Sequence, residues 1–157
     1  MATVHLLCGQ VGSGKTTFAR RLEQNGAVRF SLDEWMLRLY GAHMRREEFD
    51  ARLALCTNLI LDLCERIASL GVPAVVDAGF WRRADRDRAR ERLARAGVRF
   101  CMHLFDVPEA ERWRRLEARN RELPAGTFEI TREMFELFSG WFEPPGEDEV
   151  VHVVDAL

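Results

Sequence analysis

The chain has 157 residues, of which 47% are hydrophobic and 31% are charged, and these proportions exclude a disordered or low-complexity protein. Its formal net charge of −2 hides an asymmetry, because residues 122–157 hold nine acidic side chains and one basic side chain. No apolar run reaches the roughly 18 residues of a membrane span, and the first residues lack a positively charged leader. We therefore expect one soluble, cytoplasmic domain over residues 1–157, without a membrane partner.

Strands and helices are predicted to alternate along the chain. Short apolar runs predict five strands, at residues 3–8, 28–30, 74–77, 98–105 and 150–154. Amphipathic or charged stretches predict helices at residues 15–24, 46–70, 82–96, 109–121 and 130–142. This alternation predicts an α/β fold, a three-layer sandwich with helices on both faces of a core parallel sheet of about five strands. In such a sheet we expect a ligand at the carboxyl ends of the strands.

A glycine-rich loop follows the first predicted strand and opens the first predicted helix. Residues 9–16, Gly-Gln-Val-Gly-Ser-Gly-Lys-Thr, match the pattern GxxxxGK[ST] of a phosphate-binding loop, or P-loop. Its glycines let backbone N–H groups point at phosphate oxygens, while Lys15 reaches the outer phosphates and Thr16 offers a hydroxyl to Mg²⁺. We therefore expect a nucleoside triphosphate on Gly9, Gly12, Ser13, Gly14, Lys15, Thr16 and Thr17.

The scarcity of lysine narrows the class of P-loop protein. Lys15 is the only lysine in the chain, so the Asn-Lys-x-Asp element with which GTPases read guanine is absent from the sequence. Transporter ATPases and ring-forming ATPases need considerably longer domains. The length is instead typical of small kinases, which move a γ-phosphoryl group to an acceptor.

Four stretches carry a more specific likeness: residues 9–16, 31–35, 75–81, and 105–108 together with 119–120. In these stretches the chain resembles the small P-loop kinases of the AAA_33 or polynucleotide-kinase-like group. That group is similar to chloramphenicol phosphotransferase, shikimate kinase and gluconate kinase. The resemblance implies a kinase-type P-loop fold, ATP and Mg²⁺ as cofactors, and phosphoryl transfer to a hydroxyl.

Two aspartates stand where these kinases keep acidic groups. The resemblance implies that Asp33, just beyond the second strand, takes the proton of the acceptor hydroxyl; an N-cap role is the alternative. Asp77, at the end of the third strand, resembles a Walker B aspartate that contacts Mg²⁺ through water or holds the acceptor; a capping role is its alternative. Trp35, Phe80 and Trp81 would join both aspartates in an acceptor pocket, although aromatic core packing explains them equally well.

Arginines of the fourth predicted helix form a second candidate group. Arg112, Arg115 and Arg119 are spaced three and four residues apart, so they should share one helix face. The resemblance implies that this helix leads into a lid at residues 119–127, whose arginines stabilise the transferring phosphate. Arg119 fits this catalytic and nucleotide-binding role best and Arg115 next. A solvated arginine face is the alternative.

The sequence leaves the acceptor open. Acidic residues near Asp33 and beyond the lid suit a cationic antibiotic of the aminoglycoside type, or simply keep the protein soluble; they are Glu34, Glu47, Glu48, Asp50, Glu129, Glu133 and Glu136. Interleaved charges on the arginine-rich helix at 82–96 favour a salt-bridged face over a nucleic-acid surface. The acidic segment 122–157 also disfavours nucleic acid. We expect a small-molecule hydroxyl as acceptor; the alternatives are a polynucleotide 5′-hydroxyl, or a regulatory nucleotide-binding module with little turnover.

Overall fold

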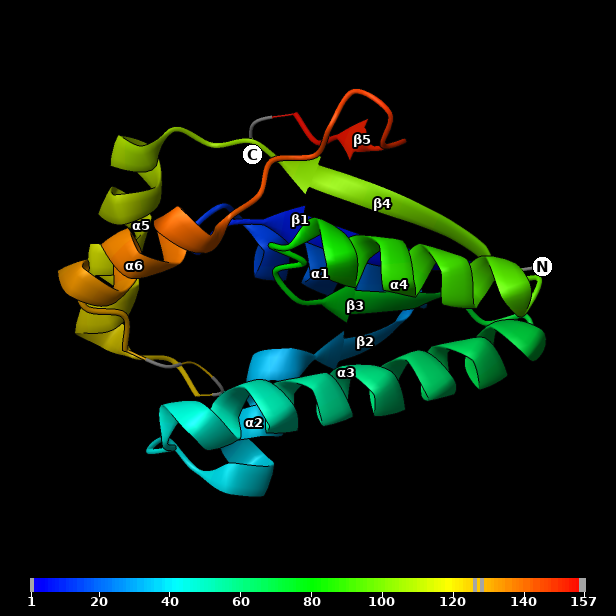
Figure 1. Ribbon diagram of the computed structural model, residues 1–157, viewed down its shortest axis with the longest axis horizontal. Helices are drawn as coiled ribbons and strands as arrows, with labels where there is room; N and C mark the ends of the chain where they lie inside the picture. The colour runs from blue at the N-terminus through cyan, green and yellow to red at the C-terminus, as the bar shows by residue number, and fades with distance from the viewer. Residues whose placement is uncertain (1, 126, 128, 156–157) are drawn as a thin grey trace.

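The computed structural model describes residues 2–125, 127 and 129–155, and it contains a five-stranded sheet (Figure 1). The strands are β1 (Thr3–Gly9), β2 (Val28–Ser31), β3 (Ala74–Asp77), β4 (Arg99–Phe105) and β5 (His152–Val153). All pairings are parallel, and the order across the sheet is β2-β3-β1-β4-β5. The prediction of an α/β fold with about five parallel strands is confirmed.

In the part of the chain that the structure describes, six helices accompany the sheet: α1 (Lys15–Gln24), α2 (Leu32–Tyr40), α3 (Arg46–Ser69), α4 (Arg83–Arg95), α5 (Glu109–Glu122) and α6 (Arg132–Trp141). Helix α1 packs on one face of the sheet, while α3 and α4 cover the other face, which gives the predicted three layers (Figure 1). Helices α5 and α6 lie beyond the carboxyl ends of the strands, at the left of Figure 1. The sheet therefore presents its carboxyl edge to these two helices.

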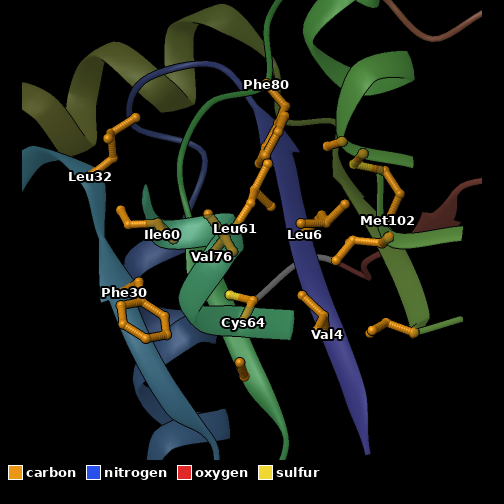
Figure 2. Close-up of a cluster of buried hydrophobic side chains, with 14 of the residues drawn as sticks. Val4, Leu6, Phe30, Leu32, Ile60, Leu61, Cys64, Val76, Phe80 and Met102 are labelled. Atoms are coloured by element: carbon orange, nitrogen blue, oxygen red, sulfur yellow. The ribbon is translucent and has the colours of Figure 1, made fainter. Parts of the chain in front are cut away.

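The main core lies between the sheet and α3 (Figure 2). Leu6 of β1 and Val76 of β3 pack there with Ile60 and Cys64 of α3. The next residue along β1, Leu7, points to the opposite face and packs in the α1 cluster. Alternate strand residues thus fill both faces, as expected for a parallel sheet covered by helices on both sides.

Two elements differ from the sequence prediction. Helix α2 was not predicted; Ser31 is its N-cap and its side chain accepts a hydrogen bond from the N–H of Glu34. Asp33 therefore lies in the first turn of α2, and the N-cap alternative for Asp33 is wrong. Strand β5 is shorter than the predicted run 150–154, because only His152 and Val153 pair with β4.

Opposite charges gather where the C-terminal segment crosses α4. Glu149 forms a buried ion pair with Arg86 and also receives a hydrogen bond from Arg90, while Asp148 pairs with Arg83. The arginine-rich helix is therefore salt-bridged, as the interleaved charges predicted. These contacts hold the acidic C-terminal segment against α4. No helix in the part of the chain that the structure describes is long and apolar enough to cross a membrane.

Candidate functional site

The glycine-rich loop joins β1 to α1 at the carboxyl edge of the sheet, where a ligand was expected. Gly12 and Gly14 have φ angles of 77° and 93°, a region that favours glycine. A Cβ atom on Gly12 would lie 2.5 Å from the carbonyl oxygen of Arg112, and one on Gly9 would lie 2.8 Å from Oγ of Ser13. The loop is thus packed so closely that glycine is required at these positions.

Lys15 folds back onto the loop that carries it. Its Nζ donates hydrogen bonds to the carbonyl oxygens of Gly9, at 2.8 Å, and of Gln10, at 2.7 Å. Desolvation of the ammonium group lowers the pKa of Lys15 to about 8, although the carboxylates of Asp77 and Asp33 oppose this shift. The Lys15 ammonium is therefore close to both predicted acidic residues, and two of its three N–H donors are bound to the loop.

Asp77 ends β3 beside the first turn of α1. Its Oδ2 accepts a hydrogen bond from the Thr16 hydroxyl at 2.8 Å, so the two predicted metal-site residues are in direct contact. Burial raises the pKa of Asp77, while the Thr16 hydrogen bond and the charge of Lys15 act in the opposite direction. Arg29 of β2 places its Nη1 3.8 Å from Oδ2 of Asp77 and also pairs with Glu34.

Asp33 lines a cavity that begins at the P-loop. Desolvation raises the pKa of Asp33, and the nearby charge of Asp77 raises it further, whereas the charges of Lys15 and Arg119 lower it. Desolvation also lowers the pKa of Arg119, with Asp33 opposing. Asp33, Lys15 and Arg119 thus form one electrostatically coupled group around the cavity.

The arginines of α5 do not all line the cavity. Arg115 and Arg119 line the cavity, and Arg115 also donates to Glu111 at 3.0 Å. Arg112 instead turns into the interface with α6, where its guanidinium lies over the ring of Phe135 and its Nε donates to a backbone carbonyl. Helix geometry keeps Arg112 near the side of Arg115 and Arg119, but α6 packs over this end of α5, so the Arg112 side chain is buried and does not line the cavity.

The predicted lid, residues 119–127, begins in the last turn of α5; residue 126 lies outside the described residues. Asn120 ties the end of α5 to the chain before α6: its Nδ2 donates to the Ile130 carbonyl at 2.6 Å, and its Oδ1 accepts from the Ile130 N–H at 3.1 Å. No role was predicted for Asn120. Its place directly after Arg119 in the matched stretch was the available signal.

One cavity of about 1610 Å³ extends from the P-loop along α3, α4 and α6. It brings together most of the predicted site residues: Gly12, Ser13, Gly14, Lys15, Thr16, Thr17, Asp33, Asp77, Phe80, Trp81, Arg115 and Arg119. Gly9 is buried at the end of β1 and does not line the cavity. Trp35 does not join the group, because its ring packs edge-on against Phe30 and the main core.

The cavity walls carry both charges, with arginine in excess. Nine basic and six acidic side chains line it. Of the acidic residues expected to attract a cationic acceptor, Asp50 and Glu129 line the cavity. Glu34 instead pairs with Arg29. Arginines of α3 and α4, among them Arg46 and Arg88, face the same space.

A parallel sheet with a P-loop after β1, and an acidic residue bonded to the P-loop threonine from β3, defines a nucleotide-binding P-loop protein of the small kinase-like group. The chain belongs to the AAA_33 family, described as an AAA domain, whose family model matches residues 4–145. No curated protein sequence matches the chain.

Solved structures share this fold at low sequence identity. A gluconokinase from Sinorhizobium meliloti is 20% identical, with a TM-score of 0.63 and coverage of 99% of this chain and 82% of that chain. A sugar kinase from Janibacter is 17% identical, with a TM-score of 0.66 and coverage of 98% and 85%. Kti12 from Chaetomium thermophilum, solved with ADP-AlF3, is 20% identical, with a TM-score of 0.67 and coverage of 96% and 88%.

Proposed function

We propose that this chain is a single-domain, ATP-dependent phosphotransferase that moves the γ-phosphoryl group of MgATP to a hydroxyl of a small molecule. The observation that carries the proposal is the position of Asp33 in the P-loop cavity, coupled to Lys15 and Arg119. A module that only binds nucleotide has no need of a carboxylate at this position. An alcohol attacks poorly until a positioned base takes its proton.

The residues divide the reaction between them. Backbone N–H groups of the P-loop and the Lys15 ammonium bind the phosphates, and Asp33 accepts the proton of the acceptor hydroxyl as its oxygen attacks phosphorus. Lys15 and Arg119 stabilise the charge on the phosphoryl oxygens, with Arg115 beside them on the same wall. The lid would exclude water, which competes with the acceptor for the phosphoryl group.

The Thr16–Asp77 pair fits a Mg²⁺ ion. Mg²⁺ prefers hard oxygen ligands and keeps several waters, so one or two protein oxygens with the phosphates suffice. The described residues contain no group of three or more histidine, cysteine or acidic side chains that could hold a metal. Thr16 would therefore bind the ion and Asp77 would hold its water shell; the bound ion neutralises charge on the phosphates.

The cavity has room for a nucleotide and an acceptor together. Its volume of about 1610 Å³ exceeds the range of roughly 300–1,000 Å³ that is usual for one small ligand. The excess of arginine over carboxylate along its walls gives less support to an aminoglycoside than the sequence did. It favours a second candidate acceptor, a polynucleotide 5′-hydroxyl, because α3 and α4 present Arg46 and Arg88 to the same space.

The test is release of ADP from MgATP across an acceptor panel of aminoglycosides, chloramphenicol, nucleosides, sugars and 5′-hydroxyl oligonucleotides. We expect stimulation by one small-molecule class, with loss of the stimulation in Lys15→Ala and Asp33→Asn. Stimulation by oligonucleotides alone would favour the second candidate. Nucleotide binding without stimulation by any acceptor would favour the regulatory module.

A further inference from the structure

The side chain of Asn120 binds both backbone groups of one residue on another part of the chain. Its Nδ2 donates to the carbonyl of Ile130 at 2.6 Å, and its Oδ1 accepts from the N–H of Ile130 at 3.1 Å. An asparagine amide carries a donor and an acceptor side by side, so it can pair with both groups at once. Ile130 is buried, and these two bonds satisfy its backbone.

The same face of α5 also holds the side chain of Ile130. Leu116 is one turn before Asn120, so the two residues share a face of the helix. Leu116 packs with Ile130 and Phe135 in a buried cluster, and Val11 of the P-loop packs against that cluster. Ile130 is therefore bound to α5 by backbone and side chain together, in a body that rests on the P-loop.

The last turn of α5 carries both Asn120 and Arg119. The ends of helices lack intrahelical partners for their backbone groups and tend to fray. Here the N–H of Leu123 donates to the Arg119 carbonyl at 2.7 Å, and the Asn120 bonds attach the same turn to Ile130. Successive helix residues point about 100° apart, so Asn120 meets Ile130 while Arg119 lines the cavity.

The position of Arg119 matters because its charge acts on the candidate base. The charges of Asp33 and Arg119 shift each other's pKa, so the guanidinium lies near the place where an acceptor would meet the phosphoryl group. A charge stabilises a transferring phosphoryl group only when it is held in place beforehand. An arginine on a frayed turn would sample many positions and would bind the phosphate less well.

We propose that Asn120 is a positioning residue for Arg119: by binding Ile130 it fixes the last turn of α5, and with it the guanidinium that faces the γ-phosphate. The proposal rests on the role of Arg119 in the proposed function. It requires no acceptor, because the γ-phosphate of bound ATP is itself the partner of Arg119. ADP lacks this phosphate, so the ratio of the two affinities reports the position of Arg119.

The first test measures two dissociation constants by calorimetry, for MgADP and for the magnesium complex of the non-hydrolysable β,γ-imido analogue of ATP. Asn120→Leu keeps the branched shape of the side chain and removes both hydrogen bonds without adding a charge. We expect its Kd for the ATP analogue to rise about fivefold and its Kd for MgADP to stay within a factor of two. Arg119→Gln, which removes the guanidinium itself, should show a rise of about tenfold or more for the analogue alone. An unchanged ratio in Asn120→Leu would overturn the proposal.

Two control variants separate positioning from stability. Asn25→Leu removes a comparable bond at the end of another helix, because Nδ2 of Asn25 donates to the Arg21 carbonyl at 2.9 Å outside the cavity. Gly97→Ala strains a backbone with a φ of 69° in open space, so it should lower Tm without touching the site. Both should keep the ratio of the unmodified chain. A ratio that falls as far in Gly97→Ala as in Asn120→Leu would assign the effect to lost stability and overturn the proposal.

The second test is a double-mutant cycle between Asn120→Leu and Arg119→Gln, read by both Kd and Tm. In the Arg119→Gln background, Asn120→Leu should leave the affinity ratio unchanged while still lowering Tm. Effects on the ratio that add in full would mean that Asn120 does not act through Arg119.

The outcomes separate this inference from the proposed function. If the unmodified chain binds neither nucleotide, the proposed function is wrong and the inference falls with it. If Arg119→Gln keeps the normal ratio, the role given to Arg119 is wrong, and so is the inference. If Arg119→Gln lowers the preference for the ATP analogue and Asn120→Leu does not, only the inference is wrong.

Discussion

At the scale of single residues, Lys15 gives the site a pH dependence of its own. Its pKa of about 8 in the free protein means that it loses its proton just above neutrality. Bound phosphates would favour the protonated form, so binding above pH 8 requires uptake of a proton. We expect the affinity for MgADP to be constant below pH 7 and to fall by up to about tenfold per pH unit above 8.

Calorimetry between pH 6.5 and 9.5 measures this dependence. Lys15→Arg serves as the control, because its guanidinium stays charged throughout this range and should give a flat profile at lower affinity. A profile equally steep in both proteins would assign the titration to another group.

Substitution of Asp33 should impair phosphoryl transfer without impairing nucleotide binding. We expect Asp33→Asn to reduce kcat about 10²–10⁴-fold while leaving the Kd of MgATP within a factor of three, because the amide cannot accept the proton. Because desolvation raises the pKa of Asp33, the kcat/KM of the unmodified protein should decline on the acid side above the ordinary aspartate range. Asp155→Asn is the matched control, since Asp155 is exposed and does not line the cavity. Full activity in Asp33→Asn would remove Asp33 from the reaction.

Some site residues could be predicted from the sequence because their spacing is local. The P-loop is one continuous motif, and Asp33 and Asp77 each follow a recognisable strand. Arg29, Asn120 and Arg86 were missed, since their contacts with Asp77, Ile130 and Glu149 form only when the strands and helices pack. Trp35 shows the reverse case. It is only two residues from Asp33, but in helix α2 this spacing places it on a different side, where its ring packs against the main core.

At the scale of elements, the P-loop packs closely against the backbone of α5. Gly12→Ala adds a Cβ atom that would lie 2.5 Å from the Arg112 carbonyl at a φ of 77°. Gly97→Ala isolates the backbone contribution, because Gly97 has a φ of 69° and open space around it. We expect Gly97→Ala to lower the free energy of unfolding by about 1 kcal/mol. Gly12→Ala should cost several times more and abolish nucleotide binding.

Chemical denaturation and nucleotide binding together check this expectation. Equal destabilisation by the two substitutions would show that α5 moves away from the loop at little cost. Retained nucleotide binding in Gly12→Ala would show that the loop tolerates the added atom.

The long amphipathic elements were predicted well and the short ones poorly. The pattern of α3 repeats over many turns, so its bounds came out within a residue or two. Helix α2 has nine residues, too few for a clear period, and its start depends on a Ser31 side-chain bond. Strand β5 is shorter than predicted, and Glu149, just before the predicted run, is paired with Arg86 of α4.

At the scale of the whole molecule, three histidines connect neighbouring strands. His5 of β1 and His103 of β4 have ring nitrogens 2.9 Å apart, and the ring of His152 of β5 lies edge-on to His103. Burial and the two neighbouring histidines lower the pKa of His103 to about 4. The unfolded chain therefore binds more protons than the folded chain between about pH 4 and 6.5.

The expected consequence is acid sensitivity well above the range of ordinary carboxylates. The free energy of unfolding should be constant between pH 6.5 and 7 and decline by about 1–3 kcal/mol toward pH 4. Urea denaturation at several pH values measures it. His103→Gln should flatten this decline, while His43→Gln, on an exposed residue outside the cluster, should retain it. A decline unaffected by His103→Gln would place the responsible groups elsewhere.

The single lysine also has a consequence for covalent chemistry. Lys15 is the only side-chain amine of the protein, and with a pKa of about 8 roughly one molecule in ten carries it as a neutral nucleophile at pH 7. An acylating reagent would therefore modify the side chains of this protein at one amine, inside the P-loop. Bound nucleotide would shield that amine, so the extent of acylation would report the occupancy of the site directly, in a cell extract as well as with purified protein.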